Sequence, residues 1–326
     1  MNKGILVFIL AVVILAFVHP AEAQAQAKVP KIGWLGARSA SSSTGIELFR
    51  REFRVLGYVE GMNIIIESRY ADDKLDRLPA LADELVSLKV DVIVTPSTVG
   101  ALAAKNATRT IPIVFLGGGD LVAAGLVDSL ARPGGNITGF TGIGAVLAGK
   151  RLELIKETVP KLSRVAVLWN PQDPSSTQQW NESQLSAREL SLQLHSMEVS
   201  SAAKFEGAFQ AATKARSGAL AVTESPLTVS NGKQIAELAT KHRLPAIYSR
   251  EDFVASGGLM SYGADRTEPY RRVASMIDKI LKGAKPADLP VEQPTKFELV
   301  INFKTAKVLG LTIPPLVMMR AEKVIK

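Results

Sequence analysis

Short apolar runs and longer stretches with an apolar stripe alternate along this chain. The runs at 32–35 and 90–94 are continuous, which is typical of strands that are buried on both faces of a sheet. Between them, Ile46, Phe49 and Phe53 recur three and four positions apart, the spacing of one helix face. Repeated alternation of this kind indicates right-handed βαβ units. The pattern therefore predicts an α/β fold with doubly wound parallel sheets covered by helices on both faces.

The amino-terminal 27 residues carry the three zones of a secretory signal peptide. Lys3 gives a positive start, 4–18 is apolar without interruption, and small residues follow at 21–27. An apolar run of 15 residues is short for a bilayer, which takes about 20 residues in a helix. An uncleaved membrane anchor is the alternative interpretation. We expect cleavage near Ala23 to Ala27 and export of the mature chain to the periplasm.

The mature chain repeats itself in outline. Three strings of the first half, each with the character of a strand, have counterparts in the same order in the second half. The pairs are 31–35 with 164–169, 91–97 with 219–226, and 107–115 with 239–248. Three matches in order predict two similar lobes. The glycine-rich passage 132–142, where strong helix formers are interrupted, is the expected seam between them.

Five longer sequence segments resemble those of a known protein family. They are Phe49–Asn63, Gly125–Phe140, Leu154–Pro171, Gly257–Gly263 and Ile301–Leu311. With them, the segment from about Val29 to Lys326 resembles the ABC transporter substrate-binding protein family, whose members include tryptophan-binding lipoproteins. The resemblance implies a fold similar to type I periplasmic binding proteins, with two lobes, a hinge of several crossings and a ligand held between the lobes. Many relatives carry a lipid-attachment cysteine, and this chain has no cysteine, so a free periplasmic form is expected.

The resemblance also implies where each lobe begins and ends. After a signal peptide at 1–27, the first lobe is expected to comprise 28–140 and 263–290, the latter including a helix at 269–281. The second lobe is expected to comprise 141–262 and 291–326. The chain would then pass between the lobes three times, which allows closure around a ligand without unfolding of either lobe.

Polar residues follow three strands of the first half, at the sheet edge where helix N-termini converge and ligands commonly bind. The candidate ligand-binding residues are Arg38 and Ser39 after the first strand, Ser97 and Thr98 after the third, and Asp120 after the fourth. Ser97 and Thr98 precede an alanine-rich helix whose free amides can bind a carboxylate. The alternative is that these two residues only cap that helix, and that Asp120 caps a helix running from Leu121.

The second half offers a matching set of candidates. They are Thr141 at the seam, Asn170 after the first strand of that half, Glu224 and Ser225 after a later one, and Tyr262 at a predicted crossing. Glu224 can hold an ammonium group, or it is a solvated loop carboxylate. Tyr262 can stack on a planar ligand, or it packs within the hinge. Trp34 and Trp169, which lie inside matching strands, are expected to belong to the core.

Charge and composition narrow the classes of function. The chain has a net charge of +8, but its basic residues occur as scattered short pairs on predicted helices, which is typical of solvated surfaces and not of a nucleic-acid interface. His195 and His242 lie outside any metal-binding spacing, and no nucleophile elbow or dinucleotide-binding turn is present. We therefore expect no catalytic residues, no metal, no cofactor and a monomer.

These observations favour a periplasmic solute-binding protein. It is expected to capture a small carboxylate or zwitterion, such as an aromatic amino acid or acid, by closure of the lobes, and to deliver it to an ABC permease in the inner membrane. The alternative of a different class is a ligand-sensing module for a membrane receptor, which would share the same fold and cleft.

Overall fold

The computed structural model describes residues 29–41, 44–117, 119–265 and 267–326. The expected signal peptide at 1–27 and the first residue of the expected first lobe lie outside these ranges. Within them, no helix combines the length and the apolar character that crossing a bilayer requires.

The described residues form twelve named strands, twelve α-helices and three short 3-10 helices. The strands are β1 (Lys31–Gly36), β2 (Ile65–Tyr70), β3 (Val92–Thr95), β4 (Ile113–Gly117), β5 (Ile137–Thr141), β6 (Arg164–Trp169), β7 (Gln193–Glu198), β8 (Ala219–Val222), β9 (Ala246–Tyr248), β10 (Met260–Ala264), β11 (Phe297–Asn302) and β12 (Lys323–Ile325). The α-helices are α2 (Gly45–Val55), α3 (Leu78–Ser87), α4 (Thr98–Ala107), α5 (Gly144–Thr158), α6 (Pro174–Glu189), α7 (Phe205–Lys214), α8 (Pro226–Ser230), α9 (Gly232–Lys241), α10 (Glu251–Ala255), α11 (Glu268–Leu281), α12 (Phe303–Val308) and α13 (Pro315–Met319). The 3-10 helices are η1 (Leu75–Arg77), η2 (Ala202–Lys204) and η3 (Pro286–Asp288).

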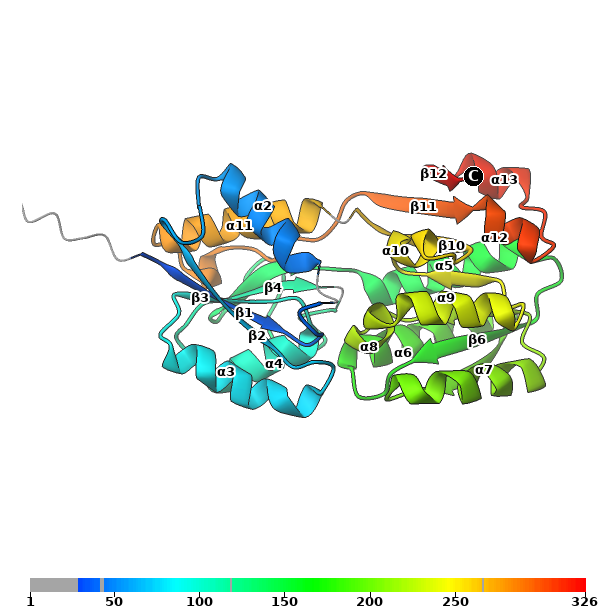
Figure 1. Ribbon diagram of the computed structural model, residues 1–326, viewed down its shortest axis with the longest axis horizontal. Coiled ribbons are helices and arrows are strands. Elements are labelled where there is room, and N and C mark those ends of the chain that lie inside the picture. Colours follow the sequence, from blue (N-terminus) through cyan, green and yellow to red (C-terminus); the bar gives the residue numbers. More distant parts are fainter. Residues whose placement is uncertain (1–28, 42–43, 118, 266) are drawn as a thin grey trace, which may run out of the picture.

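The first lobe is built on a five-stranded parallel sheet in the order β2-β1-β3-β4-β5. Helices α2 and α11 cover one face and α3 and α4 the other (Figure 1). The predicted stripe Ile46, Phe49 and Phe53 is buried against the first of these faces, next to Trp34. Because the strand order reverses between β1 and β3, the loops that follow these two strands diverge to opposite faces. They leave a crevice at the carboxyl edge of the sheet.

The second lobe is built on a seven-stranded sheet in the order β12-β11-β10-β9-β8-β6-β7. The core of the sheet repeats the first lobe, because β6, β8 and β9 occupy the ranks of β1, β3 and β4. The three string matches therefore identify equivalent strands. The expectation of parallel sheets needs one correction, since β10 pairs with β11 in antiparallel fashion. The strand β7, which contains His195, was not predicted.

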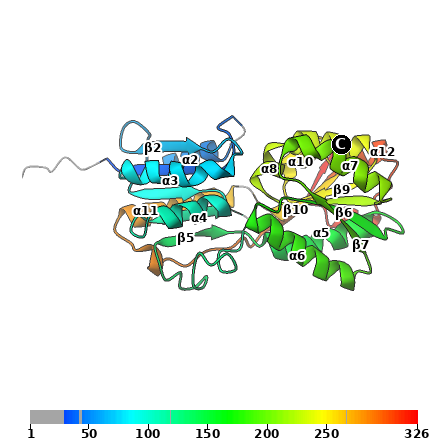
Figure 2. The same ribbon diagram turned by 90° about the horizontal axis from the view of Figure 1, so that it is seen from below.

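The chain passes three times between the two sheets: from β5 to α5, from β10 to α11 and from η3 to β11. Figure 2, seen from below, shows the lobes side by side with these segments at the waist. Neighbouring crossings are tied together, because the Thr141 amide donates to the carbonyl of Glu292 (2.8 Å) and the Asp265 amide to that of Lys296 (3.4 Å). Such a waist permits hinge bending while both sheets stay intact.

Candidate functional site

A cleft between the lobes is the main candidate site. It encloses about 1310 Å³ of empty space, including its open mouth, and its walls come from loops at the carboxyl ends of strands in both sheets. The first lobe contributes the ends of β1, β3 and β4, and the second the ends of β6, β8 and β9. The crossings contribute Gly142, Gly263 and Pro294. The cleft therefore lies where open parallel sheets bind ligands.

Arg38 brings an uncompensated positive charge to the first-lobe wall. It follows β1 and lines the cleft, and no carboxylate of the described residues lies within ion-pair distance of its guanidinium. Burial lowers the pKa of Arg38, and the positive charge of Arg250 across the cleft lowers it further. A desolvated guanidinium with five hydrogen-bond donors is a strong site for a carboxylate.

The N-terminus of α4 lies beside this charge. Ser97 is the N-cap and accepts from the Gly100 amide at 3.1 Å, so the capping alternative holds for Ser97. Thr98 differs, because its buried Oγ1 has no hydrogen-bond partner among the described residues although it lines the cleft. A Cβ on Gly119 would lie 2.1 Å from this hydroxyl, so only glycine allows the loop after β4 to approach it. Buried hydroxyls are normally bonded, so Thr98 remains a candidate for contact with a ligand.

Trp34 was expected to belong to the core, and its ring does pack on Phe49 with centroids 5.6 Å apart. It also lines the cleft, however, and its buried Nε1 has no acceptor among the described residues. A buried donor left without a partner costs about 1–3 kcal/mol. The first-lobe wall thus holds two buried polar atoms, Trp34 Nε1 and Thr98 Oγ1, that have no partner within the described part of the protein.

Asp173 brings an uncompensated negative charge to the second-lobe wall. It is buried, lines the cleft and caps α6 by accepting from the Ser176 amide at 2.8 Å. No cationic side chain of the described residues pairs with it, and burial raises its pKa to about 6, with a further rise from the nearby Glu224 charge. Asp173 is therefore ionised at neutral pH, although its carboxylate is poorly solvated.

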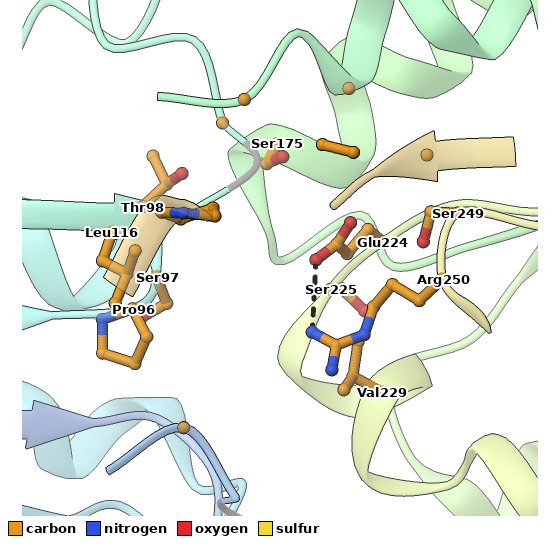
Figure 3. Close-up of a pocket in the computed structure, with 18 of the residues that line it drawn as sticks. Pro96, Ser97, Thr98, Leu116, Ser175, Glu224, Ser225, Val229, Ser249 and Arg250 are labelled. Atoms are coloured by element: carbon orange, nitrogen blue, oxygen red, sulfur yellow. Dashed lines mark ion pairs between the residues drawn. The ribbon is translucent and has the colours of Figure 1, made fainter. Parts of the chain in front are cut away.

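Glu224 lies in a charge network on the same wall. Figure 3 shows its carboxylate facing Arg250, with 3.8 Å between Glu224 Oε1 and Arg250 Nη1. Arg250 pairs more closely with Asp252, at 2.9 Å, and these two acids raise the pKa of Arg250 against the effect of burial. Arg151 also lines the cleft. It is buried and donates to the Tyr262 carbonyl at 2.9 Å, and burial lowers its pKa to about 10.

Apolar side chains form the remaining wall. Leu116, Phe140 and Tyr270 lie on the α2 and α11 side of the first sheet, and Ile143 and Leu147 come from the start of α5. The cleft thus combines a large apolar surface with a few charged groups, which is the usual composition of a small-molecule site.

A hydrogen bond joins the two lobes at the cleft mouth. The Ser230 hydroxyl at the end of α8 donates to Asp73 Oδ1 in the first lobe at 3.0 Å. Burial raises the pKa of Asp73. The lobes are therefore in contact on both sides of the cleft, at the hinge and at the mouth.

Five of the predicted site residues line this cleft, and five do not. Those that line it are Arg38, Ser97, Thr98, Glu224 and Ser225. Ser225 also forms a capping box with Thr228 at the start of α8, so it is held by its own helix. Those outside the lining are Ser39, Asp120, Thr141, Asn170 and Tyr262.

Two of the first-lobe predictions lie outside the cleft lining for a local reason. Asp120 is exposed, and its carboxylate accepts from the amides of Val122 and Ala123 at 2.9 and 3.1 Å. The helix expected from Leu121 is a series of turns, so Asp120 organises a turn instead of a helix. Ser39 is half-buried, with its hydroxyl 3.2 Å from that of Ser41.

Three of the second-lobe predictions lie outside the lining because their side chains make other contacts. Thr141 is buried and donates its hydroxyl to the Gly119 carbonyl. Asn170 is buried and accepts from the Gln172 amide at 3.0 Å, which shapes the loop leading to Asp173. Tyr262 turns its ring toward Phe297, 6.3 Å away, and offers the site only its carbonyl, which holds Arg151.

Comparison with known proteins identifies the family. The family model described as ABC transporter substrate binding protein matches residues 49–325. The chain belongs to this family. A curated relative, a tyrosine-binding protein of Clostridioides difficile, is 31% identical over 255 residues, which cover 78% of this chain and 73% of the relative. This protein is thus an ABC-family substrate-binding protein, a class that binds solutes and is not enzymatic.

Two solved structures inform the arrangement of the lobes. An ABC domain from Streptococcus pneumonia in complex with L-Trp is 26% identical, with a TM-score of 0.82, and the match covers 91% of this chain and 99% of that one. A substrate-binding protein with adhesive properties from Clostridium difficile, in its ligand-free open form, is also 26% identical over 91% of this chain and 100% of that one, but its TM-score is 0.64. At equal identity, the substrate-binding protein described here is therefore arranged more like the ligand-bound structure.

The fold is shared more widely than the sequence. A leucine-binding protein from Thermotoga maritima superposes with a TM-score of 0.56 at 15% identity, covering 80% of this chain and 78% of that one. The expected type I periplasmic-binding-protein fold, with two α/β lobes, is confirmed.

Proposed function

We propose that this substrate-binding protein captures an α-amino acid with an aromatic side chain. The observation that supports this most directly is the pair of uncompensated charges on opposite walls. Arg38 in the first lobe is suited to a carboxylate, and Asp173 in the second lobe is suited to an ammonium group. A zwitterion between them would satisfy both charges and favour closure, since it contacts each lobe with a charge of the opposite sign.

The walls suggest how the rest of the ligand is held. We assign the carboxylate to Arg38, the Thr98 hydroxyl and the first amides of α4, and the ammonium group to Asp173 with Glu224 nearby. The side chain would then lie on the apolar wall of Leu116, Phe140 and Tyr270. The relatives that bind tyrosine and L-Trp support an aromatic side chain for this protein as well.

The role in the cell follows from the family and from the amino-terminal pattern. We propose that the protein is exported to the periplasm, with the segment at 1–27 removed, and delivers its solute to an ABC permease. Closure would present both lobes to the permease in one fixed arrangement. Ligand-dependent stimulation of the ATPase activity of the reconstituted cognate transporter tests this part, and the absence of stimulation by loaded protein would contradict it.

The ligand assignment is tested by calorimetric titration of the mature protein with L-Trp, L-Tyr and L-Phe. The matched controls are tryptamine and tyramine, which lack the carboxylate, and indole-3-propionate, which lacks the amine. We expect at least one of the amino acids to bind and to raise the melting temperature, and each control to bind at least roughly 100-fold more weakly, since one charged partner is left unpaired. Absence of binding by all three amino acids, or equal binding of the controls, would reject the proposal.

A further inference from the structure

The α2 and α11 side of the cleft is mostly apolar. Trp34, Leu116, Phe140 and Tyr270 lie in the same hydrophobic cluster, and all four line the cleft. Its side chains carry two polar atoms, the Tyr270 hydroxyl and the indole Nε1 of Trp34, and Nε1 is a buried donor without an acceptor among the described residues. An isolated donor in an apolar wall specifies where a ligand must carry an acceptor.

The indole nitrogen of Trp34 lies close to a residue that lines the cleft. Side chains two residues apart on a strand share a face, so Trp34 and Gly36 of β1 lie on the same face, with Gly36 closer to the cleft. A Cβ on Gly36 would lie 3.4 Å from Trp34 Nε1 and 2.7 Å from the Tyr70 ring. Gly36 and Trp34 both line the cleft, so the buried indole nitrogen lies close to the cleft wall, beside the Tyr70 ring.

The carboxylate of an amino acid would lie elsewhere in the proposed site. It is assigned to Arg38, Thr98 and the start of α4. Arg38 follows the end of β1, and α4 packs on the opposite face of the sheet, in the cluster that contains Ala101 and Ala104. The apolar wall around Trp34 is left for the side chain. An indole N–H only donates, so its partner there has to be an acceptor atom on that side chain.

We infer that Trp34 donates its indole N–H to an oxygen on the aromatic ring of the bound amino acid. The site then selects a hydroxyphenyl side chain, as in tyrosine, over phenylalanine, which has no acceptor on its ring, and over tryptophan, whose ring nitrogen only donates. This inference rests on the proposed function, because it takes the carboxylate and ammonium groups of the ligand as placed.

Trp169 supplies an internal control. It occupies β6, the strand equivalent to β1, but its Nε1 donates to Ser196 Oγ at 2.8 Å and its ring stacks on Trp180 at 5.4 Å. It does not line the cleft. Substitution of Trp169 therefore changes a buried tryptophan outside the cleft and should leave the affinity for the ligand unchanged.

The first test compares three ligands in the unmodified protein and two variants. Dissociation constants for L-Tyr, L-Phe and L-Trp are measured by calorimetry with the unmodified protein, Trp34→Phe and Trp169→Phe. We expect the unmodified protein to prefer L-Tyr over both L-Phe and L-Trp by roughly 10- to 100-fold. The preference over L-Phe should fall to near unity in Trp34→Phe and persist in Trp169→Phe. Equal affinity for L-Tyr and L-Phe in the unmodified protein, or an unchanged ratio in Trp34→Phe, would overturn the inference.

A second measurement avoids reliance on the folding of a variant. The protein has three tryptophans, so a ¹⁵N-labelled sample gives at most three indole cross-peaks to assign. We expect L-Tyr to shift the Trp34 indole proton downfield, and L-Phe to leave it near its ligand-free position. The same displacement by both ligands would contradict the inference. If L-Phe binds as tightly as L-Tyr while tyramine does not bind, the proposed function stands and only the role of Trp34 fails. If no aromatic amino acid binds, the proposed function itself fails.

Discussion

The two walls of the cleft come from equivalent strands but differ in how their polar groups are satisfied. On the second-lobe wall most of them are bonded internally: Arg250 pairs with Asp252 and Glu224, Arg151 donates to the Tyr262 carbonyl, and Ser225 is held in a capping box. On the first-lobe wall, Trp34 Nε1 and Thr98 Oγ1 have no partner within the described residues, and Arg38 has no ion pair there. Apart from Asp173, the second-lobe wall is held mainly by its own residues, whereas the first-lobe wall has more polar groups available to a ligand.

The two lobes share equivalent strands, but the side chains at equivalent positions have different hydrogen-bond partners. The strand pairs matched in the sequence occupy the same ranks of their sheets. At those ranks, a tryptophan that serves the core in one lobe borders the site in the other. The difference lies in the neighbouring residues. Ser196 accepts a hydrogen bond from Trp169, whereas Gly36, which lies beside Trp34, has no side chain that could accept one.

We expect the largest effect from substitution of Arg38, which has no ion pair with the described residues of the first-lobe wall. Arg38→Gln should weaken binding of the proposed amino acid by roughly 100-fold, because the carboxylate loses its charged partner. The matched control is Arg50→Gln, which removes an arginine of α2 that pairs with Glu47 and Glu60 outside the cleft. Calorimetry on both variants checks this, and an Arg38 variant with unchanged affinity would show that the carboxylate lies elsewhere.

The charge of Asp173 makes binding and stability respond to pH in opposite directions. With its pKa raised from 3.8 to about 6, the protein should lose stability as the pH rises from about 4 to about 6, since the folded state holds the proton more tightly. Affinity for the amino acid should instead fall about tenfold from pH 7 to pH 5, as the carboxylate that faces the ammonium group becomes protonated.

Asp173→Asn is the control for this titration. Asparagine keeps an oxygen that can cap α6 but has no charge to titrate, so both pH dependences should flatten in the variant. Melting temperatures and dissociation constants between pH 4 and pH 8 provide the measurement. A variant that retains the full loss of affinity at pH 5 would assign the titration to another group.

The smallest effect comes from comparing two threonines. Thr98→Val replaces an unpartnered hydroxyl by a methyl group, so the ligand-free protein should keep its stability while affinity falls roughly fivefold. Thr141→Val removes a hydroxyl that is bonded to the Gly119 carbonyl, and should cost about 1 kcal/mol of stability. Urea unfolding with and without ligand separates the two. A Thr98 variant destabilised as much as the Thr141 variant would mean that the Thr98 hydroxyl serves the fold.

The sequence predicts the fold well because each strand and helix is encoded locally by its apolar spacing. It predicts the site less well because a polar side chain after a strand can turn to the cleft or to a nearby amide. Asp120 was chosen and Asp173 overlooked, although both follow a strand and accept from amides two or three residues on; only tertiary contacts place Asp173 in the cleft. Trp34 was assigned to the core because its strand is buried. The signal that was missed is Gly36, which lies two residues on along the same face of β1 and lines the cleft.

The hydrogen bond between Ser230 and Asp73 contributes little to keeping the cleft closed. It lies near solvent, where water can replace it at little net cost, so it adds little to the free energy of closure. The residence time of a solute is then governed by the contacts that the solute itself makes with the two walls. A molecule that satisfies only one wall would leave quickly, and release would begin with the separation of the lobes rather than with any change inside either of them.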